Sequence, residues 1–332
     1  MHLDVFQADG FTVMSLTDAI NKIPYVPTGL AGLFATTAIT TTRVSIEERE
    51  GQLVLVPPTA RGGPGTTVGK MRRTLREITV PHFEVNDAIM ADEVQNIRAF
   101  GSETEVETVQ AMVAGRLQEH SQNFEVTSEY HRIGAVKGIV TYADSTTLNL
   151  FDTFGVSQEA EIDFDLDNNN PAGGAVRGKC DAATRLMASN LGGLPFAGAR
   201  AEVGDSFWDN LIAHKEVRET YLNTQQAQDL RQGTAYSEFN FGGITWRNYR
   251  GAVGGTSFVH TDKAHIYAVG VPGLFRCVYA PADYIETVNT LGQRLYVKQY
   301  PMQNDKGIHL DVQMNALHYC TRPKSLLKAK RT

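Results

Sequence analysis

The sequence predicts an α+β fold in which a long β-hairpin projects from a body made of a long helix and two further regions of helix and sheet. Three observations support this prediction. Strand-like segments flank a glycine-rich stretch, 59–76, which holds five cations and no acid. A long helical pattern begins at Ser102, and from Glu238 onwards the chain turns rich in strand-forming residues.

The hairpin is expected over 41–86, after an N-terminal arm over 1–40. Its arms would be Arg43 to Val56 and Leu75 to Val85, and an arm of about 14 residues would reach roughly 45 Å. Two strands alone bury too little surface to be stable in water. Such a hairpin therefore needs a surface outside its own domain, which indicates assembly rather than catalysis. The cations at its tip are Arg61, Lys70, Arg72, Arg73 and Arg76.

The long helix has a clear start and two candidate stops. Ser102 and Glu105 form a capping box, and the helix is expected to end at Gly134 or Gly138. Apolar side chains then recur at close to the helical period, at Val106, Val109, Val113, Leu117 and Phe124. We expect this helix to lie across a sheet, with one modest apolar stripe facing it.

The second half of the chain predicts two helices followed by a set of strands. Helices are expected over 175–190 and 206–222, the second capped by Ser206 with Asp209. The clearest strand is 308–317, in which Ile308, Leu310, Val312 and Met314 share a face. The basic tail after Cys320 is expected at the margin of the fold. The aromatic residues Phe207, Trp208, Phe239, Phe241 and Trp246 are expected to pack in the core rather than to bind a ligand.

Composition excludes several classes of protein. The 332 residues carry a formal net charge of −6, which argues against a protein whose main task is to bind nucleic acid. No apolar run is long enough to span a membrane, and the N-terminus does not resemble a signal peptide. Three scattered cysteines favour a reducing cytoplasm over a disulfide framework.

Motif searches yield no predicted catalytic, cofactor-binding or metal-binding residue. The segment before Gly69-Lys70 lacks the glycine and the Ser/Thr of a phosphate-binding loop, because Pro64 and Met71 occupy those places. The tip therefore remains either a solvated loop or an inter-subunit arm. Asp163, Asp165 and Asp167 alternate like the start of a calcium loop, but the positions that need Gly and Glu hold Asn168 and Gly174. The pairs His318/Cys320 and His309/Asp311 each offer too few ligands for zinc.

The order of these parts resembles the HK97-like phage major capsid protein. The local sequence of several stretches resembles its lambda-like branch, the major capsid protein E family. The resembling stretches run along nearly the whole chain. They are SLTDAINKIPYVP (15–27), TTTRVSIEEREGQLVLVP (40–57), ADEVQNIRAFGSE (91–103), GAVKGIV (134–140), NLFDTFGV (149–156), YAPADYIETVNTLGQ (279–293) and KQYPMQNDKGI (298–308).

This resemblance implies a division of the chain into capsid parts. Residues 1–40 would be the N-terminal arm, 41–86 the extended loop, and 87–171 the peripheral domain with its spine helix over 102–138. Residues 172–290 would be the axial domain, and 291–332 would return to the peripheral domain. Some relatives cross-link through a hairpin lysine, for which Lys70 is the one candidate at this tip, although the lambda-like branch is not known for that reaction.

The same resemblance implies a function and partners. The chain would assemble into homo-pentamers and homo-hexamers of an icosahedral head that encloses double-stranded DNA without binding it specifically. Implied partners are a decoration protein, a scaffold or maturation protease, and the portal. The implied location is the virion, with assembly in the host cytoplasm and no membrane contact. The alternatives are an encapsulin-like cargo compartment on the same fold and, more remotely, an enzyme that binds phosphate or nucleotide.

Charge pairing between copies is the physical mechanism expected at the hairpin tip. The candidate acidic partners of its cations are Glu47, Glu48, Glu84 and Asp87. Each exposed ion pair contributes only about 0–1 kcal/mol, so many copies are needed to add up to a stable shell.

Overall fold

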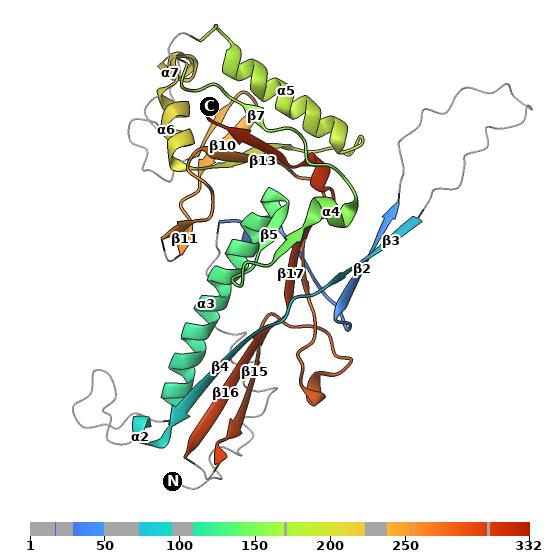
Figure 1. Ribbon diagram of the computed structural model, residues 1–332, viewed down its shortest axis with the longest axis vertical. Helices are drawn as coiled ribbons and strands as arrows, with labels where there is room; N and C mark the ends of the chain where they lie inside the picture. Colours follow the sequence, from blue (N-terminus) through green and yellow to red (C-terminus); the bar gives the residue numbers. More distant parts are fainter. Residues whose placement is uncertain are drawn as a thin grey trace, which may run out of the picture. The chain divides into compact units, whose positions relative to one another are not determined.

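The chain forms two compact units (Figure 1). The structure is a computed structural model, and it describes Thr17 and residues 29–49, 73–94, 109–168, 171–222, 238–253, 255–303 and 306–332. Unit 1 combines Met1–Ser45, Glu77–Tyr130 and Arg276–His318. Unit 2 combines Ile46–Arg76, His131–Phe275 and Tyr319–Thr332. Each unit is therefore built from segments that are far apart in the sequence.

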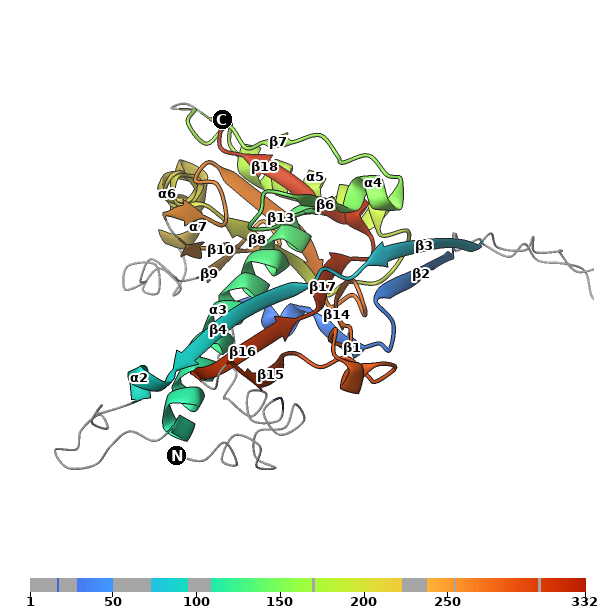
Figure 2. The same cartoon turned by 60° about the horizontal axis from the view of Figure 1, so that its bottom comes forward.

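Unit 1 contains a three-stranded antiparallel sheet in the order β15 (Tyr296–Pro301), β16 (Gly307–Met314) and β4 (Phe83–Met90). The three strands lie side by side in both views (Figures 1 and 2). The predicted alternation in β16 is confirmed, because Ile308, Leu310, Val312 and Met314 are all buried in one core cluster.

Helix α3 (Val109–Lys137) covers this sheet with its N-terminal part. Its 29 residues correspond to a length of about 43 Å. Val113, Leu117 and Phe124 pack into the same core cluster as β16, as the apolar stripe predicts. The helix ends at the second of the two predicted stops, Gly138, with φ +84°. The predicted capping box at Ser102 and Glu105 lies outside the described residues.

A second sheet aligns three strands from distant parts of the chain, β1 (Ala35–Ala38), β14 (Phe275–Tyr279) and β17 (Ala316–Cys320). Strand β1 runs parallel to β14. Within unit 1, His318 on β17 is buried, 3.4 Å from the Sγ atom of Cys277 and edge-on to Phe34. His318 is therefore part of the core of unit 1.

Unit 2 is built on a six-stranded sheet in the order β7 (Ile162–Asp163), β18 (Leu327–Lys330), β13 (Lys263–Val269), β8 (Gly198–Val203), β10 (Ile244–Asn248) and β9 (Glu238–Phe241). Helix α5 (Ala175–Asn190) matches its predicted bounds. The aromatic residues form core contacts as predicted: Phe207 stacks on Trp246 at 5.8 Å and Trp208 meets Phe239 at 5.1 Å.

Three predictions for unit 2 are wrong. The helix expected over 206–222 is two helices, α6 (Asp205–Ala213) and α7 (Lys215–Leu222), because His214 adopts an extended backbone. Gly204, not Ser206, occupies the N-cap of α6. A side chain at position 204 is excluded, because its Cβ would lie 2.2 Å from the carbonyl oxygen of His260. The tail is not marginal, because β18 pairs with both β13 and β7.

The remaining elements are short. They are η3 (Ala31–Leu33), α2 (Ala91–Val94), β5 (Ile139–Thr141), β6 (Thr147–Asn149), α4 (Leu150–Phe154), β11 (Ala252–Val253), β12 (Thr256–Ser257), η4 (Ile285–Thr287) and η6 (Pro323–Ser325). No helix within the described ranges is long and apolar enough to cross a bilayer.

The base of the predicted hairpin is formed by β2 (Arg43–Arg49) and β3 (Arg73–Thr79), which pair with each other in a two-stranded sheet. The downstream arm is shorter than predicted, because it ends at Thr79 and Pro81 interrupts the chain before β4. The alternation that reaches Val85 therefore belongs to two different sheets. The tip over 50–72 lies outside the described residues.

Candidate assembly surfaces

One contact joins the two strands at the root of the hairpin, and a second holds β3 to a neighbouring helix. Arg43 on β2 lies 3.7 Å from Glu77 on β3, an exposed ion pair. Arg76 donates from Nη1 to the carbonyl oxygen of Thr153 at 2.9 Å. Arg76, predicted to meet a neighbouring copy, thus makes this hydrogen bond within its own chain and anchors the hairpin to unit 2.

The structure describes only part of the predicted contact set. Arg61, Lys70 and Arg72 lie outside the described residues. Arg73, Glu47 and Glu48 lie on the paired strands β3 and β2, but the positions of their side chains are not among those described. The predicted contact between tip cations and acids of a neighbour stays a prediction.

Asp87 on β4 already has side-chain partners within unit 1. Its Oδ2 atom lies 2.9 Å from His120 Nε2 and 3.8 Å from Arg116 Nε, both on α3, and Oδ1 accepts the backbone N–H of Ala88. Burial opposes the charged form, but the hydrogen bonds from His120 and Ala88 outweigh it and lower the pKa of Asp87. Asp87 therefore joins α3 to the sheet.

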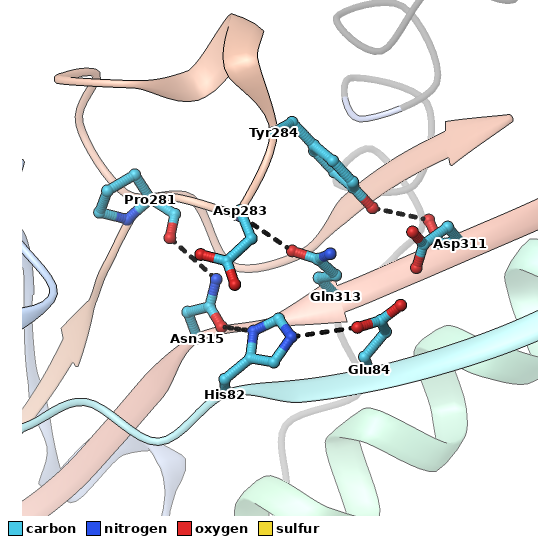
Figure 3. A network of polar contacts seen from close by, with 8 residues as sticks. All are labelled: His82, Glu84, Pro281, Asp283, Tyr284, Asp311, Gln313 and Asn315. Atoms are coloured by element: carbon cyan, nitrogen blue, oxygen red, sulfur yellow. Dashed lines mark hydrogen bonds and ion pairs between the residues drawn. The ribbon is translucent and has the colours of Figure 1, made fainter.

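Glu84 belongs to a polar network that sequence reasoning did not find (Figure 3). His82 lies 3.2 Å from Glu84 Oε2 through Nε2 and 2.8 Å from Asn315 Oδ1 through Nδ1. Asn315 in turn donates to the carbonyl oxygen of Pro281 at 2.9 Å. The network thus joins β4 to the loop over 281–292.

The same loop is held to β16 by two further hydrogen bonds. The backbone N–H of Asp283 donates to Gln313 Oε1, and the hydroxyl of Tyr284 donates to the carbonyl oxygen of Asp311, each at 3.1 Å (Figure 3). The polar residues involved alternate with the buried apolar face of β16. That alternation was the one signal in the sequence that could have located them.

The electrostatics of the network move the pKa values of its two carboxyl groups in opposite directions. Burial raises the pKa of Asp311 to about 6, and the neighbouring carboxylate of Glu84 adds to the rise. The hydrogen bond to His82 lowers the pKa of Glu84. Burial opposes protonation of His82, but its hydrogen bonds to Asn315 and Glu84 raise the pKa of His82 overall. The arrangement holds a loop in place and brings no nucleophile, base and oxyanion donors together.

The acidic alternation in unit 2 is also structural. Asp163 pairs with Lys330 on β18 at 2.9 Å and accepts the backbone N–H of Asp165. Within the part of the chain that the structure describes, no group of three or more potential ligands could hold a metal ion. These contacts fix the edge of the six-stranded sheet.

The alignments of this chain with known relatives cover almost the whole of both proteins. Major capsid proteins of Salmonella phage Felix O1 and Pseudomonas phage KPP10 are 26% and 25% identical, and the alignments cover 96% and 97% of both chains in each pair. A solved structure of a prophage protein of E. coli CFT073, assigned as a capsid protein, has a TM-score of 0.60 at 12% identity and covers 97% of this chain and 99% of its own. That likeness identifies the fold as HK97-like.

The family model described as phage major capsid protein E matches residues 12–331. The match spans both units, the paired base of the hairpin and the loop held by the polar network. The chain therefore belongs to the phage major capsid protein E family.

Proposed function

We propose that the chain builds an icosahedral phage head from homo-pentamers and homo-hexamers, and that the hairpin over 41–86 reaches onto a neighbouring copy. The observation that carries this proposal is the isolated pairing of β2 with β3. Within the described residues these strands pair with no third strand, and a two-stranded sheet is at best marginally stable alone. A neighbouring subunit supplies the missing surface.

The anchoring of the hairpin root supports this role. Arg76 fixes the root through Thr153, so the direction in which the hairpin leaves the body is set by the fold. The other cations of the hairpin are Arg61, Lys70 and Arg72 beyond the root and Arg73 at the start of β3. Glu47, Glu48 and Glu84 are the candidate acids on the neighbour, and Asp87 is the weakest candidate because its carboxylate already contacts His120 and Arg116.

The finer parts of the proposal follow from the family. The family division would place residues 87–171 and 291–332 in the peripheral domain and 172–290 in the axial domain of the assembled subunit. The two compact units divide the chain differently at 131–171, 276–290 and 319–332. A decoration protein, a scaffold or maturation protease and a portal would join the head during assembly in the host cytoplasm. The net charge of −6 suits a wall that does not hold packaged DNA tightly.

Charge reversal at the tip tests the role of the hairpin. We expect Arg72→Glu with Arg73→Glu to leave the subunit folded and to reduce shell formation, since the tip would then repel acids on a neighbour. Lys215→Glu with Arg218→Glu on α7 changes the net charge equally and is the control. Sedimentation and negative-stain microscopy measure particles, and a normal yield from the tip variant would contradict the proposal. Double-stranded DNA in particles purified from infected cells separates a phage head from a cargo compartment.

A further inference from the structure

The loop over 281–292 of unit 1 turns three large apolar side chains to water. Ile285, Val288 and Leu291 are 90%, 64% and 62% exposed. We name these three residues the apolar knob. The other large apolar side chains that the described residues expose are one to an element or loop: Leu75, Met90, Val126, Ile139, Leu194, Val253 and Tyr300. Single exposed apolar residues are normal, whereas a cluster marks an interaction surface.

The backbone of the loop satisfies its own polar groups. The hydroxyl of Thr287 donates to the carbonyl oxygens of Ala282 and Tyr284, at 2.7 and 3.0 Å. The hydroxyl of Thr290 donates to the carbonyl oxygen of Thr287 at 2.8 Å. Because Thr287 is buried and both hydroxyl groups already donate within the loop, a partner that covers the apolar knob leaves these hydrogen bonds in place.

The loop is also held at both ends. Near its start, Asp283 and Tyr284 hydrogen-bond to β16 (Figure 3). Near its end, the N–H of Gly292 donates to the carbonyl oxygen of Ile39 at 2.9 Å. A surface that is ordered before binding loses little conformational entropy when it docks. The loop that carries the apolar knob is thus held in one conformation before a partner binds.

The one acid inside the apolar knob is neutralised within the chain. Glu286 lies between Ile285 and Val288, and both its oxygens contact Lys298 Nζ, at 2.9 and 3.1 Å. A partner therefore needs apolar surface and no compensating charge. Among the described residues, the one clustered apolar surface of this kind is the apolar knob itself.

We propose that the apolar knob docks against the apolar knobs of neighbouring copies of this chain. The inference rests on the proposed assembly function and adds to it a second contact, separate from the hairpin. A patch that meets its own copy is the isologous arrangement found at two-fold axes. Burial of aliphatic side chains supplies the driving force without fixing a unique polar geometry.

Cysteine cross-linking tests the contact directly. All three native cysteines, Cys180, Cys277 and Cys320, are buried. Cross-links can therefore be attributed to the new surface thiol rather than to the native cysteines. We prepare Ile285→Cys, Val288→Cys and Leu291→Cys separately, oxidise assembled particles gently, and run non-reducing gels. At least one variant is expected to give covalent chain dimers, because docked knobs bring side chains within the Cβ separation of a disulfide, about 4 Å.

The control for cross-linking is Val126→Cys, on α3 of the same unit, where the native side chain is 43% exposed and stands alone. It is expected to give no dimers. If all three knob variants stay monomeric on the gel while the particles remain intact, self-docking is overturned.

Charge placed in the apolar knob provides the second test. Ile285→Asp with Val288→Asp is expected to lower the assembled fraction by about tenfold or more, while the melting temperature of the unassembled subunit stays near that of the unaltered chain. Ile285→Val with Val288→Ile keeps the surface apolar and is expected to assemble normally.

The outcomes separate this inference from the proposed function. Normal assembly of the double aspartate variant overturns the inference and leaves the shell function intact. Failure of the unaltered chain to form particles overturns the shell function itself. Lost assembly without any knob-to-knob cross-link shows that the apolar knob meets a different surface, such as a neighbour's N-terminal arm, and this also overturns self-docking.

Discussion

Asp311 and Glu84 show how single residues set the response of the fold to pH. The two carboxyl groups lie close together beneath the loop over 281–292, where two negative charges would repel each other. The hydrogen bond to His82 lowers the pKa of Glu84, whereas burial and the neighbouring Glu84 raise the pKa of Asp311 to about 6, so below that pH Glu84 is charged while Asp311 still holds its proton. One charge at this place is stable, and a second weakens the anchor of the loop.

The sign of the resulting pH dependence is determined by the raised pKa of Asp311. An unfolded aspartate loses its proton near pH ~4, whereas the folded group holds it to about 6. The folded state binds more protons in that window, so stability is greatest below it and falls as pH rises through about 6. His82, whose pKa is also raised, acts in the same direction, with its loss beginning near its ordinary pKa of about 6.5.

Asp311→Asn is therefore expected to flatten the decline in subunit melting temperature between about pH 4 and about pH 6. Thermal unfolding followed by circular dichroism across this range measures the effect. Asp144→Asn is the control, because hydrogen bonds to Thr146 lower the pKa of Asp144 and place its contribution below the window. An unchanged slope in Asp311→Asn would show that Asp311 does not hold its proton there.

At the scale of elements, two glycines differ in the space that surrounds them, and substituting each by alanine should have opposite effects on stability. A Cβ at Gly292 would lie 2.2 Å from the carbonyl oxygen of Tyr279, whereas nothing lies within 4 Å of a Cβ at Gly115 on α3. We expect Gly292→Ala to displace the end of the loop and to cost about 1–3 kcal/mol of unfolding free energy. Gly115→Ala is expected to stabilise the helix by about 0.5–1 kcal/mol. Chemical denaturation of both variants measures the contrast, and equal effects would refute it.

Elements with a strong apolar period were predictable, and those defined by tertiary contacts were not. Helix α5 and most of strand β16 were located correctly because their buried faces recur regularly along the chain. The strand predicted over 308–317 was too long, because β16 ends at Met314 and Ala316 begins β17, which belongs to a different sheet. Strand β8 was missed, since its buried positions Ala199 and Ala201 are small and a charged residue, Glu202, is buried beside them. The break at His214 and the strand at the tail depend on partners distant in sequence, which no local pattern reveals.

The sequence predicted that the candidate site contains an assembly hairpin, but it did not predict the strand boundaries or the apolar knob. An acid-free tip between strand-like arms indicated an assembly hairpin, and β2 with β3 forms its paired base. The end of β3 at Thr79 and the start of a different sheet at Phe83 were hidden, because alternation continues across Pro81. The apolar knob was hidden for another reason: an exposed side chain and a buried one look alike in a sequence.

For the whole molecule, assembly is expected to rest on two surfaces of opposite chemistry. The hairpin tip offers positive charge, and the apolar knob offers aliphatic surface. Charge pairs between exposed groups are weakened by salt, whose screening length falls from about 10 Å at 0.1 M to about 3 Å at 1 M. Apolar burial is not screened, and sulfate salts strengthen it. Salt type therefore separates the two contacts in one preparation.

We expect sodium chloride at about 1 M to raise the critical concentration for assembly of the unaltered chain, as measured by light scattering. Ile285→Asp with Val288→Asp should keep this sensitivity, because its tip is unchanged. Arg72→Glu with Arg73→Glu should lose it, because screening then relieves repulsion instead of weakening attraction, and sulfate should restore much of its assembly by favouring the apolar knob. Parallel sodium chloride curves for the unaltered chain and the tip variant would show that the cations of the hairpin face water rather than a neighbour.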